Sequence, residues 1–204
     1  MANINKKMKQ NQEKAETEAQ KTQLEAEAEE KARKRKIRTL MYIRAVLYAV
    51  IYVCITLALK PISYELKQLR VADAMIGLIF FDPAAGPGLI IGRFVADLLG
   101  PGGFYNAFVG TAAIGFGWYF IKYLGERGNK PVFGMLMYVL MNAVMVGVMF
   151  SYSGIYSDVS MLMCFLYIFV SSLICAVGGG MIVYKIASRS WEDILSAPAP
   201  SEEP

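Results

Sequence analysis

Six apolar segments follow residue 39, and they constrain the fold more than any other feature of the chain. They cover about residues 40–59, 71–82, 86–99, 104–124, 132–150 and 159–187. In lipid every backbone polar group must be satisfied internally, so apolar segments of this kind are expected to be helices. Four are long enough to cross a hydrocarbon layer of ~30 Å at about 1.5 Å per residue. The sequence predicts an all-α integral membrane protein with a bundle of six transmembrane helices.

The second and third segments are too short to cross comfortably. The sequence DPAAGPG at residues 82–88 separates them with prolines and glycines, which interrupt helices. Two arrangements remain open. Either both segments extend into their flanks, or they form a shorter pair packed inside the bundle.

Composition excludes several classes of function. The chain is 55% hydrophobic and contains no histidine. Its three cysteines, Cys54, Cys164 and Cys175, all lie in apolar runs, a distribution that gives no disulfide framework and no zinc site. No phosphate-binding loop is present, and no nucleophile is paired with a base. We expect no enzyme, no built-in ATPase, and no cofactor or metal.

Charge distribution predicts the topology and three parts of the chain. The basic block KARKRKIR at residues 31–38 precedes the first apolar segment, and such clusters stay in the cytoplasm. Six crossings then place both termini inside a multi-pass plasma-membrane protein. Residues 1–38 are expected to form a charged helix or a disordered extension, residues 39–190 the membrane domain, and residues 191–204 a disordered acidic and proline-rich tail. Anionic lipid head groups could attract the basic block, whereas nucleic-acid binding is not expected.

The stretch KPISYELKQLRVADA at residues 60–74 is the first candidate site, because it brings several ionisable groups between two apolar segments. Glu65, Gln68, Arg70 and Asp73 offer charges and hydrogen-bonding groups close together. Ionisable groups at membrane depth cost about 2.5–3.5 kcal/mol each, so their retention points to function. One alternative is structural: Arg70 and Asp73 are three residues apart and could neutralise each other on one helix face.

A second polar group lies in the later segments. Arg93 and Asp97 are four residues apart in the apolar sequence LIIGRFVADLLG, where they could pair with each other, contact a ligand, or do both. Asn106, Thr111 and Asn142 supply neutral hydrogen-bonding groups, although such residues often only join helices. In the first apolar segment, Ala45 and Ala49 form a small-xxx-small pair that suits either packing inside the bundle or docking of a partner subunit.

Together these motifs resemble the queuosine-precursor transporter (QueT) family. The resemblance covers about residues 40–187 and rests on ISYELKQLRVADAM, FFDPAAGPGLIIG, GPGGFYNAFVGTAA and MNAVMVG. It implies a six-helix substrate-binding (S) component of an energy-coupling factor (ECF) transporter. It also implies that the loop after the first helix covers a pocket that opens outward, and that Ala45 and Ala49 meet a shared transmembrane (T) subunit coupled to two ATP-binding subunits.

Carried over to this sequence, the resemblance assigns Gln68, Arg70 and Asp73 to the polar segment of the family, Gly110 and Thr111 to its small motif, and Asn142 to its Asn-Ala pair. Arg93 and Asp97 depart from the family pattern, as does Asn106, which stands where an acid is common. The implied ligand is a 7-deazaguanine, with Asp73 or Asp97 accepting from the ring N–H groups and Gln68 or Arg70 donating to the carbonyl.

Other readings of the sequence stay open. The chain could be an S component for a different flat, polar vitamin, a stand-alone facilitator for a similar solute, or a scaffold whose charged N-terminal helix recruits cytoplasmic factors.

Overall fold

The computed structural model of the chain describes residues 2–65, 68–101, 103–125, 131–153 and 158–196, which divide into two compact units. Helix α1 (Ala2–Ala58) contributes to both. The first unit, Met1–Tyr42, is the charged part of α1, whose described side chains are almost all exposed. Ion pairs one turn apart support this helix, for example Glu27–Lys31 at 3.7 Å and Glu30–Lys34 at 2.5 Å.

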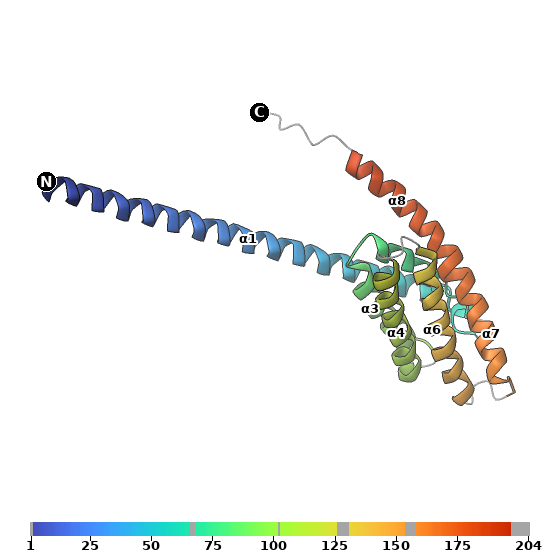
Figure 1. Ribbon diagram of the computed structural model, residues 1–204. Coiled ribbons are helices and arrows are strands. Elements are labelled where there is room, and N and C mark those ends of the chain that lie inside the picture. The colour runs from blue at the N-terminus through green and yellow to red at the C-terminus, as the bar shows by residue number, and fades with distance from the viewer. Residues whose placement is uncertain (1, 66–67, 102, 126–130, 154–157, 197–204) are drawn as a thin grey trace. The chain divides into compact units, whose positions relative to one another are not determined.

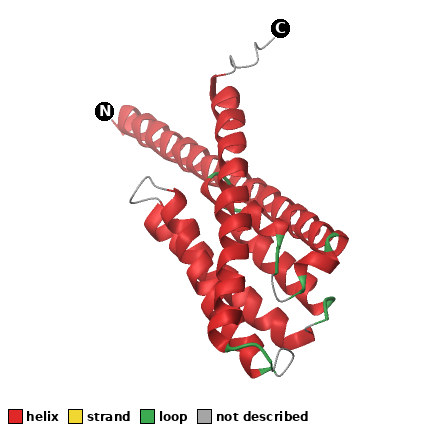
Figure 2. Ribbon diagram, turned by 90° about the vertical axis from the view of Figure 1, so that its right-hand side faces the viewer, coloured by secondary structure: helices red, strands yellow, loops and turns green. Residues whose placement is uncertain are grey.

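The second unit, Ile43–Pro204, contains the rest of the helices, and no strand occurs among the residues described (Figures 1 and 2). Three short or non-α helices complete the set: α2 (Lys60–Ser63), the 3₁₀ helix η1 (Val71–Phe80) and the π-helix η2 (Ile121–Gly125). The longer α-helices are α3 (Ala85–Leu98), α4 (Gly103–Phe120), α6 (Pro131–Tyr152) and α7 (Met161–Ser172). The π-helix η3 (Leu173–Gly179) joins α7 to α8 (Gly180–Ser196).

All six predicted apolar segments contain helix, but their lengths differ from the prediction. In the part of the chain that the structure describes, three helices are long and apolar enough to cross a membrane: Gln23–Ala58, Pro131–Tyr152 and Met161–Arg189. The segment at 104–124, expected to be a fourth, is not among them. Asn106 and several glycines lower the hydropathy of α4. Segments 71–82 and 86–99 form η1 and α3, the shorter pair that was one of the two predicted arrangements.

The core of the second unit forms where these helices meet. Helix α4 packs between α3 and α6, α6 packs against α7, and η1 packs against η3 and α8. Ile76, Leu89, Ile114 and Met135 are almost completely buried at the centre. Helix η1 can approach α8 closely because a Cβ on Gly77 would collide with the carbonyl oxygen of Gly180.

Helices α1 and α3 are in close contact through small residues. A Cβ on Gly88 would lie 2.6 Å from the carbonyl oxygen of Ala45, and one on Gly92 would lie 3.0 Å from the Cα of Ala49. Both alanines are therefore only 7% exposed. In this structure Ala45 and Ala49 pack inside the bundle, and α3 covers the face that was predicted to dock a partner.

Helix α8 ends later than the sequence suggests. It continues to Ser196, so residues 191–196, assigned above to the disordered tail, are helical. Residues 197–204 lie outside the described part of the chain, as do Lys67 and the loops at 126–130 and 154–157.

Candidate functional site

Four charged side chains from two elements meet in the interior of the second unit. Arg70 directly precedes η1, Asp73 lies in its first turn, and Arg93 and Asp97 lie on α3. All four are at most 3% exposed. Asp97 binds both arginines: its Oδ1 accepts from Arg70 Nη1 at 2.7 Å and its Oδ2 accepts from Arg93 Nε at 2.6 Å. Arg93 Nη1 reaches Asp73 Oδ1 at 3.4 Å, which completes an alternating chain of charges.

The partners are only partly those expected from sequence spacing. The Arg93–Asp97 pair forms within α3. The alternative in which Arg70 and Asp73 neutralise each other is not what the structure shows, because Arg70 pairs with Asp97 across 27 residues. In place of a side-chain pair, the backbone N–H of Asp73 donates to the carbonyl oxygen of Arg70 at 3.0 Å, which begins η1.

Two tyrosines that the sequence analysis did not single out complete this network. Tyr52 on α1 donates to Asp73 Oδ1 at 2.6 Å, and Tyr138 on α6 donates to Asp73 Oδ2 at 2.7 Å. Both are fully buried. A hydroxyl in an apolar helix needs a partner, and that is the signal that could have pointed to them. Asp73 therefore ties η1 to α1, α3 and α6.

The four charges sum to zero, and the surrounding helices leave room for them. Buried charges are tolerated when each is paired and hydrogen-bonded. Gly110 on α4 faces the Arg93–Asp97 pair: a Cβ there would lie 2.6 Å from Arg93 Nε and would collide with Asp97 Oδ2. The absence of a side chain at Gly110 is what lets α4 cover the pair.

Several buried polar atoms around the network have no hydrogen-bond partner. They are the side-chain atoms Ser63 Oγ, Gln68 Nε2, Arg70 Nε and Nη2, Arg93 Nη2, Asn106 Oδ1, Thr111 Oγ1 and Asn142 Oδ1. An unsatisfied buried polar group costs about 1–3 kcal/mol, so native proteins keep few of them without a reason. A cluster of unpaired donors and acceptors suits a site that a polar ligand completes.

The helical spacing brings the neutral residues toward this cluster. Asn106 lies one turn before Gly110 on α4, and Asn142 lies one turn after Tyr138 on α6, so each shares a face with a residue that contacts the network. Asn142 also donates to Ser172 Oγ at 2.9 Å, which joins α6 to α7. Thr111 follows Gly110 and is partly buried. Glu65 is exposed, and the structure does not bring it into the buried cluster.

Tyr64 fastens the segment before η1 onto α3. Its hydroxyl donates to the carbonyl oxygen of Ala96, and its ring lies 5.2 Å from the guanidinium carbon of Arg70. A Cβ on Gly100 would lie 2.7 Å from Tyr64 Cζ, so the glycine makes room for the ring. Tyr64 was one of the aromatic residues near the polar stretch, and it supports the arginine that the sequence analysis selected.

Gln68 combines burial with a strained backbone. It is 3% exposed and has φ of +38°, a region that favours glycine. Strain of this kind costs about 1–3 kcal/mol and often marks a functional position. We expect Gln68→Gly to raise the unfolding midpoint slightly while lowering the affinity for a polar ligand, because the strain and the buried amide disappear together. Thermal unfolding and titration of the same preparation would check this; loss of stability with unchanged affinity would contradict it.

A second polar cluster has a structural role. Asp82 accepts from the backbone N–H of Ala84 at 2.9 Å, which caps the start of α3. Its other oxygen accepts from Tyr48 at 2.9 Å and lies 3.3 Å from Arg44 Nη1. Both carboxylate oxygens are occupied, so this cluster holds α3 to α1 and does not offer a free binding group.

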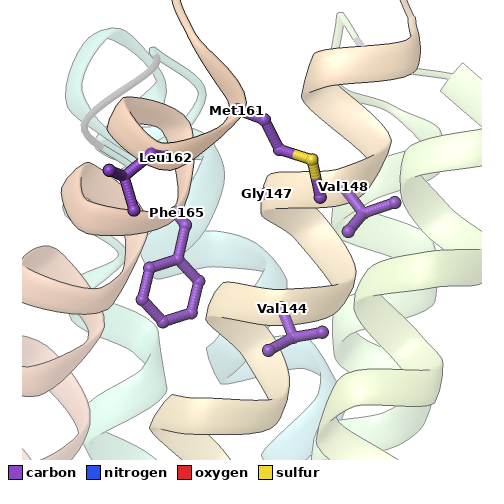
Figure 3. Close-up of a pocket in the computed structure, with 6 residues that line it drawn as sticks. All are labelled: Val144, Gly147, Val148, Met161, Leu162 and Phe165. Atoms are coloured by element: carbon purple, nitrogen blue, oxygen red, sulfur yellow. The ribbon is translucent and has the colours of Figure 1, made fainter.

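An apolar cleft of about 410 Å³ lies between α6 and α7 (Figure 3). Its lining consists of Val144, Gly147, Val148, Met161, Leu162 and Phe165. It contains none of the polar cluster's residues and has no side chain that could orient a polar ligand. We therefore assign the candidate site to the buried charges and amides.

The fold and this site define a helical membrane protein with a polar site inside its membrane domain. Within the described ranges no group of three histidine, cysteine or acidic residues could hold a metal ion. The chain belongs to the QueT transporter family, whose model matches residues 42–189. It is therefore a membrane transport protein and not an enzyme. Neither the curated proteins nor the solved structures gave a match to the chain.

Proposed function

We propose that this protein is the S component of an ECF-type importer and that it binds a 7-deazaguanine queuosine precursor from the outside. The observation that carries the proposal is the buried network of paired charges surrounded by unpaired donors and acceptors, in a chain of the QueT transporter family. A transporter that only packs its helices has no reason to leave so many buried polar groups unsatisfied.

The contacts suggest which groups meet the ligand. Asp73 and Asp97 were expected to accept from the ring, but partners already occupy both oxygens of each carboxylate. The unpaired amide oxygens of Asn106 and Asn142 are better placed to accept from ring N–H groups and an exocyclic amine. Gln68 and Arg70 donate to ligand acceptors. In this proposal the two carboxylates position the arginines and η1.

The proposal also includes partners that supply the energy. A T subunit and two ATP-binding subunits would drive release of the ligand into the cytoplasm, with the S component in the plasma membrane and both termini inside. We retain Ala45 and Ala49 as the proposed partner interface. Because α3 covers both in the isolated chain, docking through them requires α3 to separate from α1.

Uptake of a labelled 7-deazaguanine tests this function. Cells that express the chain together with an ECF T subunit and its ATPases are expected to accumulate the label, and cells without the ATPases are expected not to. Uptake that persists without any ECF ATPase would support the stand-alone facilitator instead. Deletion of residues 2–36 addresses the scaffold: we expect transport to survive it, because the site residues all lie in the second unit.

A further inference from the structure

The polar site carries a second inference, which rests on the proposed function and concerns the chemical class of the ligand. We infer that Arg70 reads a carboxylate on the ligand through the free edge of its guanidinium group, and that the site therefore discriminates against a ligand bearing an ammonium group at the same position.

The geometry of Arg70 provides the first step. Its Nη1 donates to Asp97 Oδ1 at 2.7 Å, while Nε and Nη2 have no partner. Nε–H and Nη2–H lie on the same edge of the planar guanidinium and point in parallel, the arrangement that binds both oxygens of a carboxylate. The side chain is only 2% exposed, so bulk water does not satisfy this edge.

Neighbouring groups hold that edge in place. The ring of Tyr64 lies 5.2 Å from the guanidinium carbon, and Tyr64 is itself fixed by its hydrogen bond to the carbonyl oxygen of Ala96. Together with Asp97, these contacts fix the plane of the guanidinium on one edge and one face. A preorganised fork loses little conformational entropy when it binds a planar acceptor.

The charged atoms that remain open are all donors. Asp97 uses both oxygens for Arg70 and Arg93, and Asp73 uses both for Tyr52 and Tyr138. The unpaired atoms of the charged residues are Arg70 Nε, Arg70 Nη2 and Arg93 Nη2. An ammonium group would meet guanidinium edges with no free carboxylate, whereas a ligand carboxylate would be shared by two cations.

A matched pair of ligands tests this inference with the full-length protein in detergent. The pair is 7-deazaguanine carrying either a carboxylate or an aminomethyl group at C7, titrated by calorimetry against wild type and Arg70→Lys. Lysine keeps the charge but has no fork. We expect the carboxylate ligand to bind wild type about 10- to 150-fold more tightly than the amine, the range that a charge-assisted hydrogen bond gives. In Arg70→Lys most of this preference should be lost.

Each result bears on the inference. Equal binding of the two ligands to wild type, or tighter binding of the amine, would overturn it while leaving the proposed function standing; it would mean that the free edge only holds water. Binding of neither ligand would overturn both. Arg189→Lys changes an exposed arginine and serves as the matched control. If Arg70→Lys does not fold, the wild-type preference alone decides.

Discussion

Replacing Asp97 with alanine should lower the stability of this protein more than any other single change at the site. Asp97 is the only carboxylate that binds Arg70 in the described structure, and it also binds Arg93 at 2.6 Å. Asp97→Ala would leave two buried guanidinium groups close together, with Asp73 as their remaining counter-charge. Breaking a buried pair in this way costs about 3–5 kcal/mol, because the charges left behind stay desolvated.

The measurement is thermal unfolding in detergent, followed by the fraction of monodisperse protein. A loss of that size corresponds to a fall of roughly 6–20 °C in the unfolding midpoint for a chain of this length. Asp158→Ala removes an exposed carboxylate and is the control, for which we expect little change. If the two variants unfold at the same temperature, Asp97 does not hold the network together.

Much of the site was accessible from the sequence because charged residues are conspicuous in apolar segments. Arg93 and Asp97 stand alone in their segment, and their spacing of four residues predicts the pair that α3 contains. The same argument failed for Arg70. It assumed an α-helix running from Arg70 through Asp73, whereas Arg70 lies before a 3₁₀ helix and its partner is on α3. Spacing rules describe neighbours along a helix and do not identify partners on another element.

Other features depend on tertiary contacts that spacing does not encode. Tyr52 and Tyr138 are two of 12 tyrosines, and nothing local separates the two that bind Asp73 from those on the surface. Ala45 and Ala49 were correctly recognised as a site of close helix packing. Sequence could not say whether the approaching helix belongs to a partner or to α3, because Gly88 and Gly92 lie beyond a turn whose path the sequence does not specify.

Gly110 provides the second large effect, and it separates the geometry of the site from its charge. Gly110→Ala introduces a single methyl group, but that group would lie 2.6 Å from Arg93 Nε and 2.9 Å from Arg93 Nη2. Both contacts are closer than real Cβ atoms make, so either the ion pair or α4 must move. Overpacking of this kind costs typically 1–3 kcal/mol. We expect Gly110→Ala to lower the unfolding midpoint and to weaken binding of the 7-deazaguanine at least tenfold.

Gly115 is the matched control on the same helix. A Cβ there would meet nothing within 4 Å, so Gly115→Ala adds the same methyl group without a collision. Alanine favours helix over glycine by about 0.5–1 kcal/mol, and this variant should be as stable as wild type or slightly more stable. Calorimetric titration and thermal unfolding of both variants would separate the two sites. If Gly110→Ala binds as Gly115→Ala does, the Arg93–Asp97 pair can shift without affecting the ligand, and the site must lie farther from α4 than we propose.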